Sequence, residues 1–217
     1  FMWLIPLVRK FLIKYKKYNK VNGLLKGTTM DSTDTNIELA KDPKTSIDEL
    51  QAFTLNENVW VRKAVASNTA ISSELLEKLS HDKSLDVKAS VANNKNTSSK
   101  TLELLAGDKD YCIRLIVAKN LNAPLAILEN LAKDKDEDVR RGVAENVNCS
   151  EELFEALSED EDENVQLAIA ENINTPYEIL EKLAKDGDQF IRRVILMHEY
   201  VPENIKLNIK RDGILDK

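Results

Sequence analysis

A column of basic side chains recurs along the chain and could bind an anionic ligand. Five of its six positions are Lys or Arg, each 26 residues after the last. The column reads Arg62, Lys88, Arg114, Arg140, Gln166 and Arg192. Such a row could neutralise phosphates, or it could pair with aspartates of the adjoining turns (Asp110, Asp136 or Asp188) and fix the register between repeats. We favour the structural interpretation, because a residue that keeps register must recur in every repeat, whereas a binding residue need not.

Acidic turns form a second pattern, which has the spacing of a calcium-binding loop. The first, third, fifth and twelfth positions of an EF-hand loop are occupied by Asp134, Asp136, Asp138 and Glu145. The segment 160–171 repeats this spacing with Asp160, Asp162, Asn164 and Glu171. Val139 and Val165, however, occupy the sixth position, where the sharp turn of the loop requires Gly. Helix-capping acids explain the same residues, so we expect no metal site.

Catalytic patterns find little support in the chain. His81 and His198 lie in different columns, and the sequence contains no Gly-rich phosphate loop, nucleophile elbow or Cys/His cluster. We therefore expect neither an enzyme nor a cofactor. Cys112 and Cys149 form no disulfide framework and are predicted to be small packing residues, which favours a reducing, cytoplasmic location.

A period of 26 residues organises most of the chain. One column reads Val61, Val87, Ile113, Val139, Val165 and Ile191, and another reads Asn68, Asn94, Asn120, Asn146 and Asn172. Leu columns begin at Leu76 and Leu79. Cutting the chain before each first helix gives six units without insertions or deletions. The units are 45–70, 71–96, 97–122, 123–148, 149–174 and 175–200.

Each unit predicts two short helices joined by an acidic turn. Thr97 and Thr175 stand where a cap of the first helix would be. The acids of the turn favour the start of the second helix, and the Asn column predicts its end in the left-handed conformation. Neither helix is long enough to be stable alone, so the units must stack around a continuous core. We predict an all-α, right-handed α-solenoid of about six 26-residue repeats with partial end repeats. The second helix of each repeat is expected to be short, either α-helical or 3₁₀.

The repeat motif resembles that of the leucine-rich repeat variant family, a helical solenoid in the style of HEAT and armadillo repeats. The pattern N-x-N-T-P-x-x-(I/L)-L-x-x-L-A-x-D-x-D-x-x-V-R-x-x-V-A is matched best by residues 120–146 and 172–198, and the resemblance covers about residues 35–210. It implies a scaffold that binds protein partners. The founding member of the family adds an N-terminal Cys cluster that holds an iron–sulfur centre. This chain lacks that cluster, so the resemblance implies no cofactor.

Side chains that depart from the repeat pattern are the candidates for binding a partner. Large aromatics precede the Val61 column only in the outer units, at Trp60 and Phe190, and Tyr111 is a further aromatic off the pattern. Trp and Tyr are favoured binding anchors. We therefore select Trp60, Tyr111 and Phe190 as anchors, with Arg114 and Arg140 as a basic stripe. Alternatively, Trp60 and Phe190 cap the two ends of the core.

Residues 1–20 differ in kind from the repeats. Residues 1–30 contain seven of the 31 Lys and Arg and none of the 37 Asp and Glu. A membrane-facing amphipathic helix would use Trp3, Leu4, Leu7, Phe11, Lys10, Lys14 and Lys17. The apolar run is too short to span a bilayer. Two other interpretations stay open: the segment caps the first repeat, or the native product begins at Met30.

Composition and organisation together favour a non-enzymatic repeat scaffold. With only six Gly and five Pro among 217 residues, the chain lacks the turn residues of a many-stranded β fold. We divide it into a basic helix (1–20), a linker (21–34) and a solenoid (35–217), with full repeats at 45–200 and a C-terminal cap at 201–217. We expect a monomer that binds proteins. The alternatives are a nucleic-acid-binding protein related to HEAT-like DNA-repair glycosylases and a peripheral membrane adaptor; the acidic solenoid disfavours nucleic acid.

Overall fold

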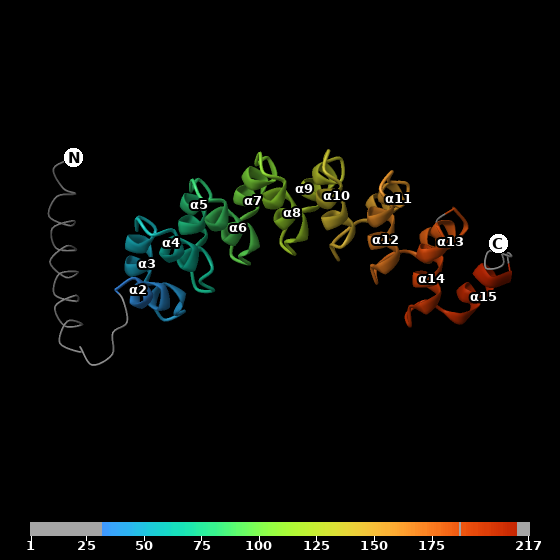
Figure 1. The fold of residues 1–217 in the computed structure, drawn as a ribbon, viewed down its shortest axis with the longest axis horizontal. Helices are drawn as coiled ribbons and strands as arrows, with labels where there is room; N and C mark the ends of the chain where they lie inside the picture. The colour runs from blue at the N-terminus through green and yellow to red at the C-terminus, as the bar shows by residue number, and fades with distance from the viewer. Residues whose placement is uncertain (1–31, 187, 212–217) are drawn as a thin grey trace.

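The computed structural model describes residues 32–186 and 188–211 of the chain. Within these ranges there are fourteen α-helices and no strand, and the helices follow one another along an arch (Figure 1). The predicted all-α solenoid is therefore confirmed. Each repeat packs against its neighbours in sequence, as expected of an architecture built from nearest-neighbour contacts.

Two sets of helices alternate along the arch. The first helices of the six units are α3 (Ile47–Phe53), α5 (Ser73–Leu79), α7 (Ser99–Ala106), α9 (Leu125–Leu131), α11 (Glu151–Ser158) and α13 (Tyr177–Asp186). The second helices are α4 (Val59–Ala66), α6 (Leu85–Asn93), α8 (Tyr111–Lys119), α10 (Glu137–Ala144), α12 (Glu163–Glu171) and α14 (Gln189–Met197). The partial repeats supply α2 (Ser32–Lys41) and α15 (Glu203–Arg211) at the two ends. The second helices are α-helices of 8 or 9 residues, so the 3₁₀ option is wrong.

Serine and aspartate side chains start most of the helices. Ser98 caps α7, because its Oγ accepts a hydrogen bond from the Thr101 amide. Asp110 likewise caps α8, and its carboxylate accepts from the Cys112 amide. Thr97 and Thr175 are not the caps that we predicted. Their hydroxyls instead donate to the carbonyls of Val91 and Ile169, tying each loop to the helix before it.

One continuous core runs through the stack. The members of the Val61 column are all buried, as are Leu76, Leu102, Leu128, Phe154 and Leu180. Each such side chain contributes about 1.5–3 kcal/mol relative to an exposed one. Because the helices are too short to be stable alone, this burial between neighbours maintains the helical structure.

The asparagine column joins successive repeats. The Asn94 side-chain amide donates to the carbonyls of Ala66 (2.8 Å) and Asn68 (3.0 Å), and its Oδ1 accepts from the Asn96 amide (2.9 Å). The predicted left-handed conformation is wrong, since Asn94 has φ −76° and ψ 129°. Asn is therefore suited to this position by its amide group, which donates to the previous repeat and accepts within its own loop. The column is a structural ladder.

Candidate interaction surface

The first four members of the basic column, Arg62, Lys88, Arg114 and Arg140, form a ladder of ion pairs with aspartates of the following repeats. Arg114 donates to both carboxylate oxygens of Asp134, from Nε at 2.6 Å and from Nη2 at 2.8 Å. Arg140 makes the same two bonds with Asp160, at 2.7 and 2.9 Å. Two-point pairs of this kind are geometrically specific, and they link each second helix to the turn of the following repeat.

The acceptor is the first aspartate of each turn. We predicted Asp110, Asp136 or Asp188, but these residues lie at the N-caps of the second helices and accept from backbone amides there. The first aspartate, such as Asp134, is left to receive the arginine from the repeat before. Each turn therefore uses two aspartates: the first pairs with the arginine of the preceding repeat, and the second caps the second helix of its own repeat.

Hydrogen bonding and burial shift the pKa values of the ladder aspartates in opposite directions. The hydrogen bond from Arg62 is the largest influence on Asp82 and holds the pKa of that carboxyl below its ordinary value. Burial acts to raise the pKa of Asp134, but the bonds from Arg114 and the Asp136 amide outweigh it, so that this pKa is also lowered. Both carboxyl groups therefore keep their charge to a lower pH than an unperturbed Asp would.

The predicted basic stripe is wrong for Arg114 and Arg140. Both residues are buried, and their guanidinium groups are committed to Asp134 and Asp160. Arg114 also donates to the carbonyls of Asp108 and Lys109, which leaves this side chain little capacity for an external ligand. The interpretation that the sequence favoured, pairing with aspartates of the adjoining turns, is confirmed for these two residues, although with a different aspartate of each turn.

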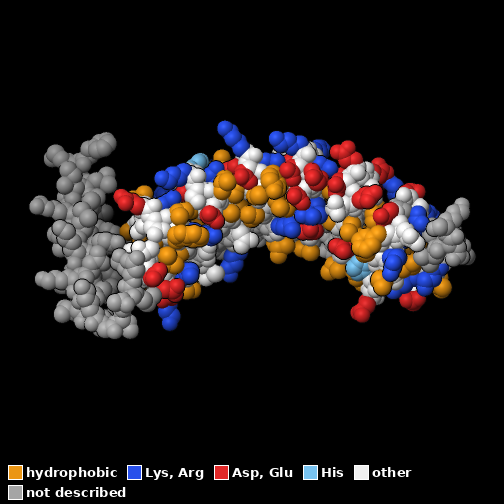
Figure 2. Space-filling model, in the orientation of Figure 1, with side chains coloured by type: hydrophobic (Ala, Val, Ile, Leu, Met, Phe, Trp, Pro, Cys, Tyr) orange, Lys and Arg blue, Asp and Glu red, His pale blue; other side chains and the backbone are white. Residues whose placement is uncertain are grey.

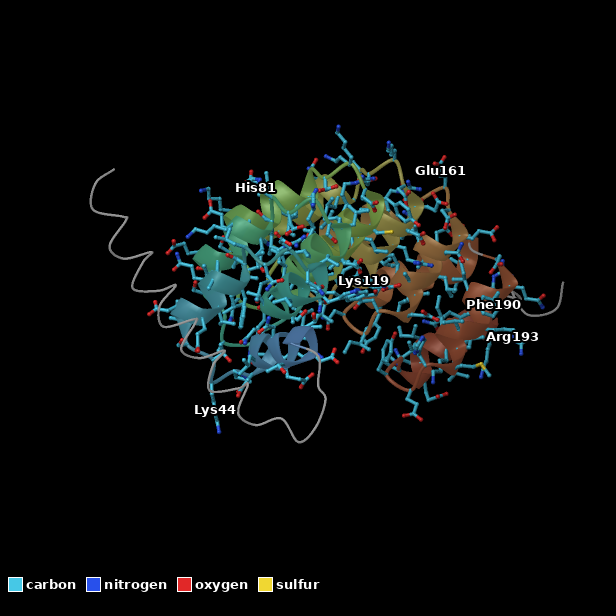
Figure 3. The ribbon with its side chains drawn as sticks, turned by 60° about the vertical axis from the view of Figure 1, so that its left-hand side comes forward. Lys44, His81, Lys119, Glu161, Phe190 and Arg193 are labelled. Atoms are coloured by element: carbon cyan, nitrogen blue, oxygen red, sulfur yellow. The ribbon has the colours of Figure 1, made fainter. Side chains whose placement is uncertain are left out.

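The three aromatic candidates lie on the surface. The exposed fraction is 56% for Trp60, 42% for Tyr111 and 58% for Phe190. Each belongs to the first turn of a second helix, and Phe190 is labelled on α14 in Figure 3. The Lys63 ammonium lies 5.2 Å from the centroid of the Trp60 ring. Trp60 and Phe190 are thus more than half exposed, which does not fit the alternative that they cap the ends of the core.

The aromatic rings do not form one patch. Their helices α4, α8 and α14 are spaced along the whole arch (Figure 1), because each repeat displaces the next along the stack. A partner that touched all three would have to be extended, or several partners would use separate positions.

Sequence reasoning missed a further row of exposed aliphatic side chains. Leu121, Val147 and Ile173 directly follow the Asn column in three consecutive repeats, with exposed fractions of 63%, 45% and 66%. We call these three residues the aliphatic row. The signal was present in the sequence, because the same position is Thr69 and Lys95 in the first two units. Hydrophobic side chains gather along the lower edge of the arch in Figure 2.

The acids with calcium-loop spacing have other partners. Asp134 pairs with Arg114, Asp136 caps α10, and Asp138 lies 2.6 Å from Nη2 of Arg141. In the described ranges, no group of three or more His, Cys, Asp or Glu residues is placed to hold a metal ion. The acidic turns therefore have a structural explanation.

The histidines and cysteines lie in separate environments. His81 follows α5, whereas His198 follows α14 and packs against the Tyr200 ring at a centroid distance of 4.7 Å. Cys149 is half-buried, and burial raises the pKa of its thiol to about 12. Cys112 is exposed, so the prediction that it packs inside is wrong.

The membrane candidates of the N-terminal segment lie outside the described residues. Trp3, Leu4, Leu7, Phe11, Lys10, Lys14 and Lys17 all precede Ser32, where the description begins. Among the helices from α2 to α15, none is long and apolar enough to cross a membrane.

Comparison with known proteins finds a similar solved structure. It is described as a leucine-rich repeat variant with a novel repetitive protein structural motif. The two chains are 22% identical over 78% of this chain and 77% of that one, with a TM-score of 0.38. That repeat class is the one the sequence motif resembles. No protein-family profile matches the chain, and no curated protein matches it significantly.

Proposed function

We propose that the chain is a non-enzymatic scaffold that binds protein partners along the exposed surface of its repeats. The main support is that some columns of the repeat make bonds between repeats, whereas other positions vary and are exposed. The Asn column and the Arg–Asp ladder are committed to bonds between repeats, as the contacts of Asn94 and Arg114 illustrate. Recognition then falls to side chains that vary from repeat to repeat, and Trp60, Tyr111 and Phe190 expose large rings at such positions.

The solenoid form suits this function because several modest contacts can add along one surface. The proposal assigns no catalytic step, since His81 and His198 are far apart in the repeat order. The free thiols of Cys112 and Cys149 fit a cytoplasmic protein.

The ion pairs of the ladder weaken the alternative proposal that the chain binds nucleic acid. It depended on a free row of guanidinium groups, and Arg62, Arg114 and Arg140 are paired with aspartates inside the ladder. The remaining test is direct. Labelled duplex DNA that bound the chain with an affinity falling steeply with salt would overturn the scaffold proposal.

Affinity purification from the native host tests the proposal with matched variants. We expect a stoichiometric protein partner to be retained by the unmodified chain and lost from the triple variant Trp60→Ser, Tyr111→Ser and Phe190→Ser. The control is Leu55→Ser, Leu104→Ser and Leu207→Ser, which removes three other exposed apolar side chains. Equal retention of the partner by both triple variants would show that the three rings are not part of the binding surface. If the unmodified chain retained no partner, the scaffold proposal would be contradicted.

A further inference from the structure

Two members of the aliphatic row, Val147 and Ile173, lie in an unusually acidic stretch of the surface. The segments 145–152 and 171–178, each a loop with the adjoining helix ends, carry Val147 and Ile173 together with five Glu and no Lys or Arg. The acids are Glu145, Glu151, Glu152, Glu171 and Glu178, and all five are exposed. Leu125 and Tyr177, the first residues of α9 and α13, add exposed apolar surface at the same ends of the repeats. We call this region the acidic–apolar edge.

The acidic–apolar edge is confined to the later repeats. At the position of Val147, the first two units have Thr69 and Lys95, and the loop of Lys95 carries no exposed large aliphatic residue. The segment around Leu121 carries no acid, and the ammonium of Lys119, the last residue of α8, lies 2.5 Å from the Glu145 carboxylate, which Arg141 also approaches at 3.6 Å. Glu145 is therefore paired within the chain, and Glu151, Glu152, Glu171 and Glu178 are the acids left for a partner. The change in chemistry occurs on an unchanged backbone framework, as expected where a repeat array presents a local binding surface.

The backbone beneath the aliphatic row is held in place. The side-chain amide of Asn148 donates to the Leu121 carbonyl at 2.6 Å, and that of Asn174 donates to the Val147 carbonyl at 2.9 Å. These bonds join each loop to the next. A partner would therefore meet a surface whose spacing is already set, which lowers the ordering cost of binding.

The spacing of the row is suited to a helix that lies along it. Packed helices are about 8–10 Å apart, which sets the approximate distance from one repeat to the next. Residues seven apart on a single helix are separated by about 10.5 Å along its axis. A helix with apolar residues at i, i+7 and i+14 could thus place one side chain against each member of the row.

We propose that the acidic–apolar edge binds a basic amphipathic helix of a partner protein. This inference rests on the proposed scaffold function and specifies its site and ligand chemistry. The apolar stripe of the helix covers Leu121, Val147 and Ile173, while Lys or Arg side chains on its flanks face the unpaired acids of the edge, Glu151, Glu152, Glu171 and Glu178. Charge complementarity selects a basic partner and speeds its association, and apolar burial supplies much of the affinity.

A designed peptide tests this proposal with the full chain. The probe is a fluorescently labelled 18-residue peptide of Leu and Lys, with Leu at helical positions i, i+3 or i+4, and i+7. We expect saturable binding by fluorescence anisotropy, and weaker binding at higher salt. A peptide of the same composition in scrambled order should bind at least tenfold more weakly, because it lacks the apolar stripe.

Two pairs of variants locate the binding. Val147→Ser with Ile173→Ser, and separately Glu151→Lys with Glu152→Lys, should each weaken binding at least tenfold. The charge control is Glu103→Lys with Glu129→Lys, two exposed acids of first helices, which changes the net charge equally. The apolar control is Leu55→Ser with Leu207→Ser. All substituted side chains are exposed, and unchanged circular dichroism would show that each variant is folded.

The possible outcomes are distinct. No binding, or equal loss in the Glu151/Glu152 and Glu103/Glu129 variants, would overturn the proposal. A photo-reactive benzophenone residue at position 147 should cross-link to the peptide; a cross-link to residues 1–20 of this chain or to a second copy would identify another occupant and also overturn it. If the peptide fails while a partner from the native host is still retained through Trp60, Tyr111 and Phe190, the inference is wrong but the scaffold function stands.

Discussion

Arg114 and Asp134 form a two-point ion pair across the boundary between the third and fourth repeats, with donor–acceptor distances of 2.6 and 2.8 Å. The two residues are 20 positions apart in sequence, as are Arg62 and Asp82, and the same offset recurs at Arg140 and Asp160. Each pair joins one second helix to the following turn. Stability of the array is therefore coupled from repeat to repeat through buried charge as well as through the apolar core.

Removing one member of this pair should strongly destabilise the solenoid. We expect Asp134→Ala to lower the free energy of unfolding by about 3 kcal/mol, because it leaves the Arg114 guanidinium buried without its carboxylate. Urea titration followed by circular dichroism measures this change. The control is Lys78→Ala, which breaks the exposed Lys78–Glu74 pair and should cost less than about 0.5 kcal/mol. Equal effects of the two substitutions would contradict the buried ladder.

Stability should decline in acid through the aspartates of the ladder. Because the pKa values of Asp82 and Asp134 are lowered in the folded state, these groups bind fewer protons folded than unfolded. Their contribution is complete above the unfolded pKa of about 3.9 and is lost as pH falls through the lower folded value. Asp82→Asn should be less stable at neutral pH but lose less stability on acidification. Parallel pH curves for variant and unmodified chain, from urea midpoints, would refute the assignment.

Much of the fold follows from the 26-residue period. Recurring Val and Leu columns identify the buried side chains, because a stacked array buries the same position in each unit. The period does not identify the partner of Arg114, because the next turn offers two aspartates, Asp134 and Asp136. Only the way in which neighbouring repeats stack selects Asp134. The extended conformation of Asn94 was missed for a similar reason: its amide bonds to the preceding repeat, and that contact outweighs the local preference of Asn for a left-handed helix end.

The surface was harder to predict than the core. Burial of the Val61 column is required by the fold, whereas exposure of Cys112 or Leu121 depends on which way one residue of a short helix or loop faces. The aliphatic row is visible in the sequence only when the column after the asparagines is compared across all six units. A rare aromatic residue such as Trp60 is recognised by its type alone, whereas Leu, Val and Ile are common in the core columns and are not distinctive by type.

Replacing a buried asparagine of the ladder by the isosteric aspartate should destabilise the solenoid. We expect Asn120→Asp to destabilise the chain by about 1–3 kcal/mol, because it removes the donor to the Ala92 carbonyl, now at 2.6 Å, and buries an acceptor in its place. Unfolding in urea measures the change. Asn122→Asp is the matched control, since Asn122 also donates to the preceding repeat but at an exposed site. A larger cost for Asn122→Asp would count against the ladder.

Gly142 marks a close approach between α8 and α10. A Cβ atom there would lie 2.7 Å from Cδ1 of Leu115 and 3.2 Å from Cβ of Ala118. Gly142→Val should destabilise the chain by about 1–3 kcal/mol through overpacking. Gly142→Ala should cost less, because the end of Leu115 can rotate and Ala favours the helix by about 1 kcal/mol. Thermal melts compare the two variants, and a more stable Val variant would exclude the steric explanation.

The ladder changes at Gln166, and an arginine there should strengthen the solenoid. Gln166 keeps the bond from its side-chain amide to the Asp160 carbonyl, at 2.7 Å, but a neutral side chain provides no ion pair for Asp186, 20 positions further on. Gln166→Arg should therefore raise the free energy of unfolding by about 0.5–1 kcal/mol, a small gain because Asp186 is exposed. The gain should vanish when Asp186→Asn is added, which a double-mutant cycle measures. A gain that survives the second substitution would show that the introduced guanidinium acts through other contacts and that the 20-residue offset does not extend to this boundary.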